Sequence, residues 1–181
     1  MKKLIIIALL MIAMVACKTP DARQPISVKT GSFIDKSVQR NIKLNQQEHD
    51  LIEQIIKDNP NTNYIAAEHG FWYYYNTQIE SDSINPKFGD IVNFNYNITD
   101  FNGVTIYSTQ EIKTKNYAVD QEELFSGLRE GIKLLKAGET ATFLFPSQKA
   151  YGYYGDTNRI GLNTPIICKV TINTITQKET N

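Results

Sequence analysis

Residues 121–139 read QEELFSGLREGIKLLKAGE, and this stretch decides the fold. Its apolar side chains recur three or four positions apart, which is the spacing that places them on one face of a helix. They are Leu124, Leu128, Ile132 and Leu135. Gly138 follows the last of them and is a residue type that commonly ends a helix. We therefore predict one amphipathic helix over about Gln121–Lys136.

Alternating patterns on both sides of this helix predict strands. Between residues 92 and 99 every second residue is apolar and the others are Asn or Thr, which indicates a strand with one wet face. Residues 140–145 alternate again, and residues 165–175 are rich in β-branched side chains. Asn102-Gly103 suits a hairpin turn because both residue types tolerate positive φ. The chain beyond residue 86 is therefore expected to be β-rich around a single helix.

The aromatic segment GFWYYYN, residues 70–76, contains the one tryptophan of the chain and predicts a further strand. Successive side chains of a strand point to opposite faces. At least two of the five aromatic residues must therefore point away from the core or cover a neighbouring element. We favour packing within a sheet over a ligand-stacking platform.

Apolar residues between positions 34 and 56 also recur at helical spacings. They predict a helix that begins near residue 32 and ends at Asp58, before Asn59-Pro60-Asn61. Because this proline-containing break separates the helix from the rest of the chain, we predict that residues 33–58 form a dimerisation or docking arm. The alternative is a helix that packs on its own domain.

The first seventeen residues have the order of a bacterial export signal: Met-Lys-Lys, an apolar run from Leu4 to Met14, and then Val15-Ala16-Cys17. The run is too short for a spanning helix, which needs about 20 apolar residues. The place of Cys17 resembles the bacterial lipoprotein box, which implies removal of residues 1–16 and acylation of Cys17. The mature protein would then be anchored to a membrane by lipid. The alternative is a short anchor that is never cut.

Residues 17–31 are polar, contain Pro20 and Pro25, and predict a flexible tether. Asp does not follow Cys17, and no acidic pair lies just beyond it. In lipoprotein families an Asp after the cysteine, or an acidic pair beyond it, marks retention in the inner membrane or export to the surface. We therefore predict a lipid anchor in the cell envelope, at the periplasmic face of the outer membrane.

The charge balance and the reactive residues exclude several classes of function. Lys and Arg number 19, as do Asp and Glu, so the chain lacks the basic surplus that a nucleic-acid partner requires. His49 and His69 are twenty residues apart without nearby cysteines or paired carboxylates, which predicts no metal site. With Cys17 lipidated, no intramolecular disulfide is expected, and the apolar neighbours of Cys168 predict a small buried side chain. The sequence contains no nucleophile elbow and no phosphate loop.

Four segments resemble the FKBP-type peptidyl-prolyl isomerase family over residues from about 86 to 176, and their order and spacing fit that family. They are Lys87–Asp90 (KFGD), which leads into the strand with Tyr96, Leu124–Gly131 (LFSGLREG), Leu135–Glu139 (LKAGE) and Phe145–Gly152 (FPSQKAYG). The lipoprotein box, the first helix and the aromatic strand further resemble the gliding-motility-associated isomerase lipoproteins within that family.

The resemblance implies an α+β fold, in which an antiparallel half-barrel sheet wraps around one short helix after an N-terminal helix and an aromatic strand. The implied organisation is a signal peptide 1–16, a tether 17–31, the helix and aromatic strand 32–85, an isomerase domain 86–176 and a tail 177–181. The implied reaction is rotation about X–Pro bonds without a cofactor, in proline-containing segments of exported envelope proteins or of a gliding motility apparatus. The amide barrier is about 18–20 kcal/mol, so uncatalysed exchange takes roughly tens to hundreds of seconds.

The resemblance also assigns roles in a shallow apolar pocket between helix and sheet. As the catalytic groups, Tyr151 would present its hydroxyl to a substrate carbonyl and Phe125 would supply a backbone N–H as a second donor. Leu124 and Phe125 would lie under the proline ring. The other substrate-binding positions are Tyr96 as a wall, Ile106, Tyr107, Leu128, and Ile160 closing the loop side. Plain core packing is the alternative for Tyr96 and Phe125.

Several positions depart from the family pattern. Ile106-Tyr107 stands where the family usually has Phe-Asp, so we expect the pocket carboxylate to be missing. Leu128 replaces the tryptophan floor of many members, Cys168 replaces an aromatic residue of the final strand, and a pocket aromatic is replaced around Lys115. These changes predict weak isomerase activity. They leave open a chaperone or scaffold that binds client chains through the same groove without useful catalysis, and a structural subunit of an envelope machine.

Overall fold

A computed structural model describes residues 31–80 and 84–179 of the chain. The predicted signal peptide, the predicted lipidation site Cys17 and most of the predicted tether lie outside these residues. The chain divides into two units, one up to residue 39 and one from residue 40 onward, and every described strand belongs to the second unit. Nowhere in the described ranges does a helix combine the length and the apolar character needed to cross a membrane.

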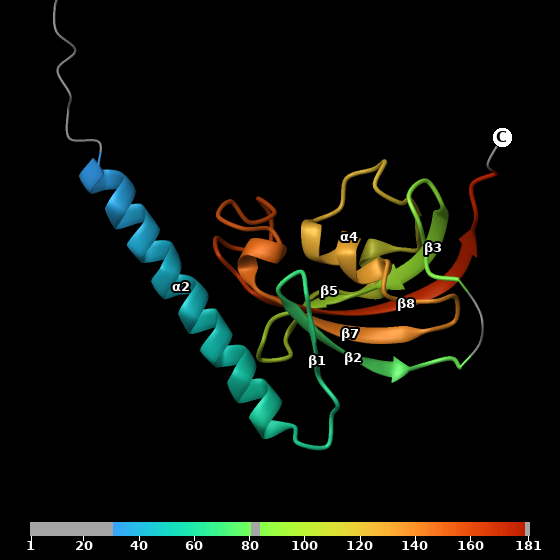
Figure 1. The fold of residues 1–181 in the computed structure, drawn as a ribbon, viewed down its shortest axis with the longest axis horizontal. Helices are drawn as coiled ribbons and strands as arrows, with labels where there is room; N and C mark the ends of the chain where they lie inside the picture. Colours follow the sequence, from blue (N-terminus) through green and yellow to red (C-terminus); the bar gives the residue numbers. More distant parts are fainter. Residues whose placement is uncertain (1–30, 81–83, 180–181) are drawn as a thin grey trace, which may run out of the picture. The chain divides into compact units, whose positions relative to one another are not determined.

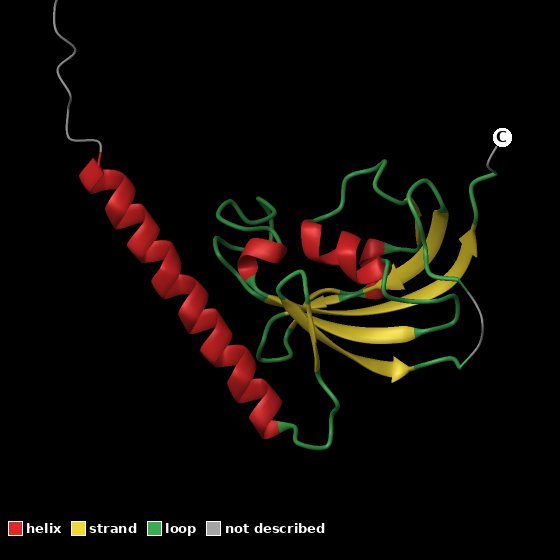
Figure 2. Cartoon of the chain, in the orientation of Figure 1, coloured by secondary structure: helices red, strands yellow, loops and turns green. Residues whose placement is uncertain are grey.

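Figures 1 and 2 show the elements along the chain. The helical segments are α2 (Gly31–Asp58), α3 (Thr109–Ile112), α4 (Ser126–Ile132) and the 3₁₀ turn η1 (Ser147–Lys149). The strands are β1 (Ile65–Ala67), β2 (Phe71–Thr77), β3 (Ile91–Tyr96), β4 (Ile98–Thr99), β5 (Thr105–Tyr107), β6 (Lys115–Ala118), β7 (Thr140–Phe145) and β8 (Ile166–Thr176). The predicted α+β class is confirmed.

The described strands form one antiparallel sheet in the order β1-β2-β7-β8-β3-β6, with β4 paired to β5 and β8. Strand β8 is the centre of this sheet and pairs with β7 on one side and with β3 and β4 on the other. Buried side chains alternate along β3 and the first part of β8, because one face of the sheet covers the core and the other does not. The ribbon view shows α4 lying over the curved sheet, as in the half-barrel that the resemblance implies (Figure 1).

Two glycines allow α4 to lie close to β7. A Cβ atom on Gly127 would come within 2.5 Å of the ring of Phe145, and one on Gly131 within 2.9 Å of the ring of Phe143. The two phenylalanine rings stack on each other with their centres 5.5 Å apart. Any larger residue at these glycines would push the helix off the sheet. The position of the chain just before α4 is therefore set by this contact.

The helix predicted over Gln121–Lys136 is shorter in the structure, so that prediction is wrong at both ends. Phe125 has an extended backbone, with φ −62° and ψ 146°, and α4 begins only after it. Beyond Ile132 the chain continues in turns, and Gly138, with φ +85°, leads it into β7. The apolar spacing persists through these turns because the side chain of Leu135 is still buried in the core. Periodicity alone therefore overstates the length of the helix.

Two short helical segments, α3 and η1, were not predicted. The signal for α3 was present in the sequence, because Ser108 and Glu111 have the spacing of a capping box. The Ser108 N–H donates to Oε2 of Glu111 at 2.9 Å, and the Glu111 N–H donates to Oγ of Ser108 at 3.3 Å. The segment η1 follows Pro146 and leads directly into the loop that contains Tyr151. Both segments lie next to residues of the candidate site in the sequence.

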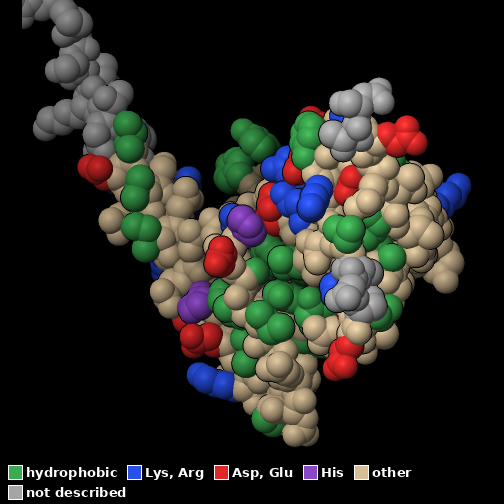
Figure 3. Space-filling view, turned by 45° about the vertical axis from the view of Figure 1, so that its right-hand side comes forward, with side chains coloured by type: hydrophobic (Ala, Val, Ile, Leu, Met, Phe, Trp, Pro, Cys, Tyr) green, Lys and Arg blue, Asp and Glu red, His purple; other side chains and the backbone are tan. Residues whose placement is uncertain are grey.

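The aromatic side chains of β2 divide between the two faces of the strand, as predicted. Phe71 and Tyr73 face the core, where their rings lie 5.9 Å and 5.6 Å from that of Phe143. Trp72 points to the opposite face, and its ring lies 5.2 Å from that of His49 on α2. Figure 3 shows hydrophobic side chains gathered beside the two histidines. Strand β2 is therefore packed on both faces.

The part of α2 that belongs to the second unit is fastened to it. Ile52 is fully buried and Glu48 is 3% exposed. The Glu48 carboxylate accepts hydrogen bonds from the N–H of Ser147 at 2.7 Å and from its hydroxyl at 2.6 Å. Residues 40–58 therefore follow the alternative of a helix packed on its own domain. In the first unit, Figure 3 shows exposed hydrophobic side chains on the helix, where Ile34 is the most exposed and Val38 is also exposed; in the second unit Ile42 is exposed.

Candidate functional site

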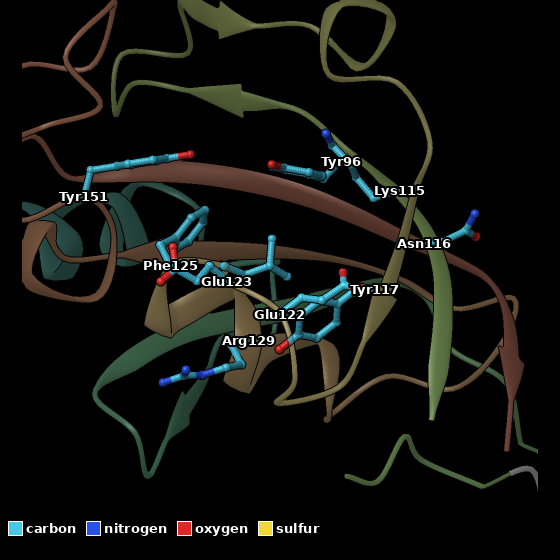
Figure 4. A pocket seen from close by; sticks show the side chains of 10 residues that line it. Tyr96, Lys115, Asn116, Tyr117, Glu122, Glu123, Phe125, Arg129 and Tyr151 are labelled. Atoms are coloured by element: carbon cyan, nitrogen blue, oxygen red, sulfur yellow. The ribbon is translucent and has the colours of Figure 1, made fainter. Parts of the chain in front are cut away.

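Two adjoining hollows lie where strands β3 and β6, the segment before α4 and the loop after η1 meet. The first has a volume of about 810 Å³ and the second of about 490 Å³. Tyr96, Lys115 and Tyr151 line both, so these three side chains form the boundary between the hollows. Figure 4 shows the first hollow, with Tyr96 and Lys115 on one side and residues 122–129 on the other.

The two tyrosines present their hydroxyl groups to the hollows. In Figure 4 the hydroxyls of Tyr96, from β3, and Tyr151, from the loop after η1, point toward one another. Among the described residues neither hydroxyl has a hydrogen-bond partner. Burial raises the pKa of Tyr96 to about 12 and also raises the pKa of Tyr151. Both side chains are therefore neutral phenols at physiological pH and are available as donors.

Phe125 and Leu124 line the first hollow from the extended segment before α4. The ring of Phe125 lies 5.1 Å from that of Tyr151 and 5.4 Å, edge to face, from that of Phe145. The backbone N–H of Phe125 finds no acceptor in the described part of the chain. The first hollow therefore combines an apolar floor with a free hydroxyl donor, and the lining residue Phe125 also has a free amide donor.

The structure brings most of the predicted site residues together. Tyr96, Leu124, Phe125 and Tyr151 line the first hollow, and Tyr107 lines the second. The other three, Ile106, Leu128 and Ile160, pack into or against the core and line neither hollow. Leu128 is fully buried, so this position of α4, where the sequence predicts the loss of a tryptophan floor, exposes no side chain to the hollow.

A charged rim surrounds the first hollow and was not predicted from the sequence. Glu122 and Glu123 lie on one side and Lys115 on the other, and all three are exposed. None of them forms an ion pair within the described ranges. On the same side as the glutamates, Nε of Arg129 lies 3.7 Å from Oδ1 of Asp120. No sequence pattern marks these positions, because exposed charges occur in most loops.

The second hollow contains the carboxylate that we expected to be missing, on a different element. The hydroxyl of Tyr107 donates a hydrogen bond to Oδ2 of Asp156, and both side chains line this hollow. The guanidinium of Arg159 lies 4.9 Å from the centre of the Tyr107 ring. Its Nη1 donates to the carbonyl of Ile106 at 2.9 Å and to Oε1 of Glu111 at 2.7 Å. The carboxylate was expected on β5 alone, whereas the acid comes from the loop after η1.

The acids of the second hollow are ionised at physiological pH. Burial raises the pKa of Asp156, but hydrogen bonds from Tyr107 and from the N–H groups of Asn158 and Ile160 outweigh it, so the pKa lies below its usual value. Hydrogen bonds from Ser108, and then the contact with Arg159, lower the pKa of Glu111 to about 2. The hydrogen bond to Asp156 in turn raises the pKa of Tyr107, which therefore remains the donor.

No group of three or more His, Cys, Asp and Glu side chains in the described ranges has the arrangement of a metal site. Cys168 is a free cysteine that is fully buried in β8, as predicted. Burial raises the pKa of its thiol. The polar groups that line the hollows are hydroxyl, amide, carboxylate, ammonium and guanidinium groups, all suited to binding a polypeptide through its carbonyls and side chains.

Comparisons with known proteins agree with this geometry. A model of the FKBP-type peptidyl-prolyl cis-trans isomerase family matches residues 82–173. A peptidyl-prolyl cis-trans isomerase from Pseudomonas syringae pv. tomato is similar in structure, with a TM-score of 0.60 and 17% identity over 75% of this chain and 95% of that one. The N-terminal domain of FKBP42 from Arabidopsis thaliana has a TM-score of 0.57 and 15% identity over 64% of this chain and 94% of that one. FkpA from Escherichia coli has a TM-score of 0.58 and 20% identity over 96% of this chain and 82% of that one.

The chain belongs to the FKBP-type peptidyl-prolyl cis-trans isomerase family, since the family model spans half of its length. It is accordingly a peptidyl-prolyl cis-trans isomerase, and the TM-scores to the solved structures show a shared fold at low sequence identity. A search of curated proteins gives no match.

Proposed function

We propose that the first hollow binds the proline of an X–Pro segment, and that Tyr151 and Phe125 hold the adjoining carbonyl groups of the substrate. The observation that carries this assignment is the combination of an apolar floor with two donors that have no partner in the described chain. A proline ring is apolar and lacks an N–H, so it suits the ring of Phe125. The carbonyls on either side of it suit the free hydroxyl and the free amide.

Rotation about the X–Pro amide requires neither a nucleophile nor a proton acceptor, because no bond is broken. The barrier comes from the partial double bond of the planar amide. The planar amide is more charge-separated than the twisted one, so an apolar surface destabilises the planar state more. A hydrogen bond from Tyr151 holds the carbonyl while the other side of the bond turns, which reduces the entropy cost of reaching the twisted state.

The expected activity is weak. Leu128 lies below the lining and gives the proline ring no tryptophan face, so the contact area is smaller than with an aromatic floor. Losing a donor that acts on developing charge costs about 10²–10³ in rate. Amide rotation creates no full charge, so each donor in this site contributes less than that.

We also propose that the enzyme acts on exported proteins while anchored in the cell envelope, including clients of a gliding motility apparatus. The export signal, the place of Cys17 and the narrower resemblance to the gliding-motility-associated isomerase lipoproteins support this proposal. Cys17→Ser should release the protein from detergent-extractable membranes into the soluble fraction. A Cys17→Ser protein that is processed and still membrane-bound would contradict the anchor.

The exposed stripe of α2 supports a second proposal, that two copies pair through residues 33–58. In the first unit, Ile34 and Val38 are four residues apart and 62% and 47% exposed, so they share one helix face, and Ile42 in the second unit is 55% exposed. A second copy would present the same side chains and bury them. Light scattering on a soluble chain that begins at Gln24 should give a dimer, and a strict monomer at high concentration would contradict the pairing.

A chaperone or scaffold that uses the same groove without useful catalysis is the alternative function. The volume of the first hollow, about 810 Å³, and its charged rim favour binding of a chain longer than one proline. Two measurements on the same wild-type protein separate the functions: isomerisation of a short proline peptide, and suppression of aggregation of an unfolded protein. Accelerated isomerisation of the peptide supports the enzyme. Isomerisation at the uncatalysed rate, together with full suppression of aggregation, supports the chaperone.

A further inference from the structure

Asp156 closes the loop that follows Tyr151. Its Oδ1 accepts hydrogen bonds from the N–H groups of Asn158 at 2.9 Å and Ile160 at 2.7 Å, and its own N–H donates to the Ile160 carbonyl at 3.1 Å. One carboxylate oxygen therefore satisfies the backbone of the loop. The second oxygen, Oδ2, is left for a contact outside the loop.

The loop between β4 and β5 has the same bonds and serves as an internal comparison. Oδ1 of Asp100 accepts hydrogen bonds from the N–H groups of Asn102 at 2.9 Å and Val104 at 2.8 Å, and the Asp100 N–H donates to the Val104 carbonyl at 3.0 Å. Oδ2 of Asp100 meets only the side-chain amide of Asn102, at 3.4 Å and exposed. A loop of this kind is therefore built without a tertiary contact from Oδ2.

Oδ2 of Asp156, in contrast, accepts a hydrogen bond from the hydroxyl of Tyr107 across the second hollow. Tyr107 belongs to β5, and its ring is covered by Arg159, so the tyrosine is held on the sheet. An ionised acceptor makes this a charge-assisted hydrogen bond, which is roughly twice as strong as a neutral one. Both partners line the hollow together with Tyr96 and Tyr151. The bond therefore ties the loop that contains Tyr151 to the sheet that contains Tyr96.

We propose that Asp156 is a positioning residue of the isomerase site: by holding Tyr107 through Oδ2, it fixes the loop that carries Tyr151 and so aims the Tyr151 hydroxyl at the substrate. This inference rests on the proposed function. Asp156 acts through Tyr107 and does not touch the rotating amide. Since the loop keeps its own bonds through Oδ1, losing the Oδ2 contact should lower turnover more than it lowers stability or substrate affinity.

The test is a double-mutant cycle with Asp156→Asn and Tyr107→Phe. Asparagine keeps an oxygen for the two loop N–H groups and replaces the charged acceptor Oδ2 with an amide nitrogen, which cannot accept the Tyr107 hydroxyl and offers only a neutral donor in its place. Phenylalanine removes only the hydroxyl. Values of kcat and KM are measured with one proline peptide for the wild type, both single variants and the double variant. Each single variant should lose about tenfold in kcat at unchanged KM. The double variant should lose no more kcat than the more impaired single variant, because both changes remove the same charge-assisted bond.

Asp100→Asn is the matched control, since it makes the same chemical change in the comparison loop, and its kcat should equal that of the wild type. A wild-type kcat in Asp156→Asn, or a double variant whose loss is the product of the single losses, would overturn the inference. If Asp156→Asn fails to fold, Tyr107→Phe alone decides, because full kcat in that variant overturns the inference as well. A wild type at the uncatalysed rate would instead overturn the proposed function and this inference with it.

Discussion

The loops of residues 100–104 and 156–160 are each closed by an aspartate that accepts two backbone hydrogen bonds and donates one, yet only the second loop belongs to the site. In the first loop the second carboxylate oxygen of Asp100 stays within the turn, and in the second loop that of Asp156 meets Tyr107. Local chemistry therefore shapes both loops, and one tertiary contact separates a connecting turn from a wall of the binding site. Gly155 and Asp156 each have a counterpart in the first loop, so a change in one loop can be measured against the same change in the other.

The largest effect is expected from Gly155→Ala. Gly155 has φ +67°, and a Cβ atom there would overlap the backbone carbonyl of Ile160. Gly103 in the other loop has φ +82° but open space around it. Gly103→Ala should cost about 1–2 kcal/mol of unfolding free energy, the cost of positive φ alone. Gly155→Ala should lower the unfolding free energy clearly more, as measured by urea unfolding. Equal losses in the two variants would show that the backbone at Ile160 can move away from the added Cβ atom, and would contradict the prediction.

A smaller difference is expected between Asp156→Ala and Asp100→Ala. Both changes remove the acceptor for two loop N–H groups, so that part of the cost is shared. Asp156→Ala also leaves the Tyr107 hydroxyl without its acceptor. The difference in unfolding free energy should be about 1.5 kcal/mol, the lower end of the net contribution of a hydrogen bond to a charged group. Identical losses in urea unfolding would contradict a structural contribution from Oδ2.

The smallest effect concerns pH. The pKa of Asp156 is lower in the folded protein than its ordinary value of 3.8, so its ionised form is stabilised by folding. That contribution is complete above about pH 4 to 5 and is lost as the pH falls through the folded-state pKa. The wild type should therefore lose more stability on acidification below about pH 4 than Asp156→Asn does. Parallel curves for the two proteins, measured by thermal unfolding at several pH values, would contradict the charged state of the acid.

The β-rich chain around one helix follows from the sequence, because apolar side chains alternate at 92–99 and recur helically at 124–135. The division of the β2 aromatics follows from the geometry of any strand. The ends of α4 do not, because the turns after Ile132 keep the same residues in the core without a helical backbone.

The candidate site shows the same division. Tyr96, Phe125 and Tyr151 were accessible through the resemblance, because they lie in segments with family spacing. Asp156 was not, since its contact with Tyr107 joins residues 49 positions apart in the chain. A usable sequence signal did exist: Asp156 precedes Asn158 and Ile160 at the spacing with which Asp100 precedes Asn102 and Val104. The repeated turn predicts the bonds of Oδ1, but the partner of Oδ2 becomes known only once the fold places Tyr107 beside it.

The most direct test of the site is the cis–trans exchange rate of a proline-containing peptide, measured by NMR exchange spectroscopy with wild-type protein and three variants. The wild type should accelerate exchange, Tyr151→Phe should accelerate it less through loss of the hydroxyl, and Phe125→Ala should accelerate it least through loss of the floor. Tyr154→Phe is the control, because Tyr154 lies in the same loop and is 80% exposed, and it should match the wild type. A wild type at the uncatalysed rate, or a Tyr151→Phe rate equal to that of the wild type, would contradict the account.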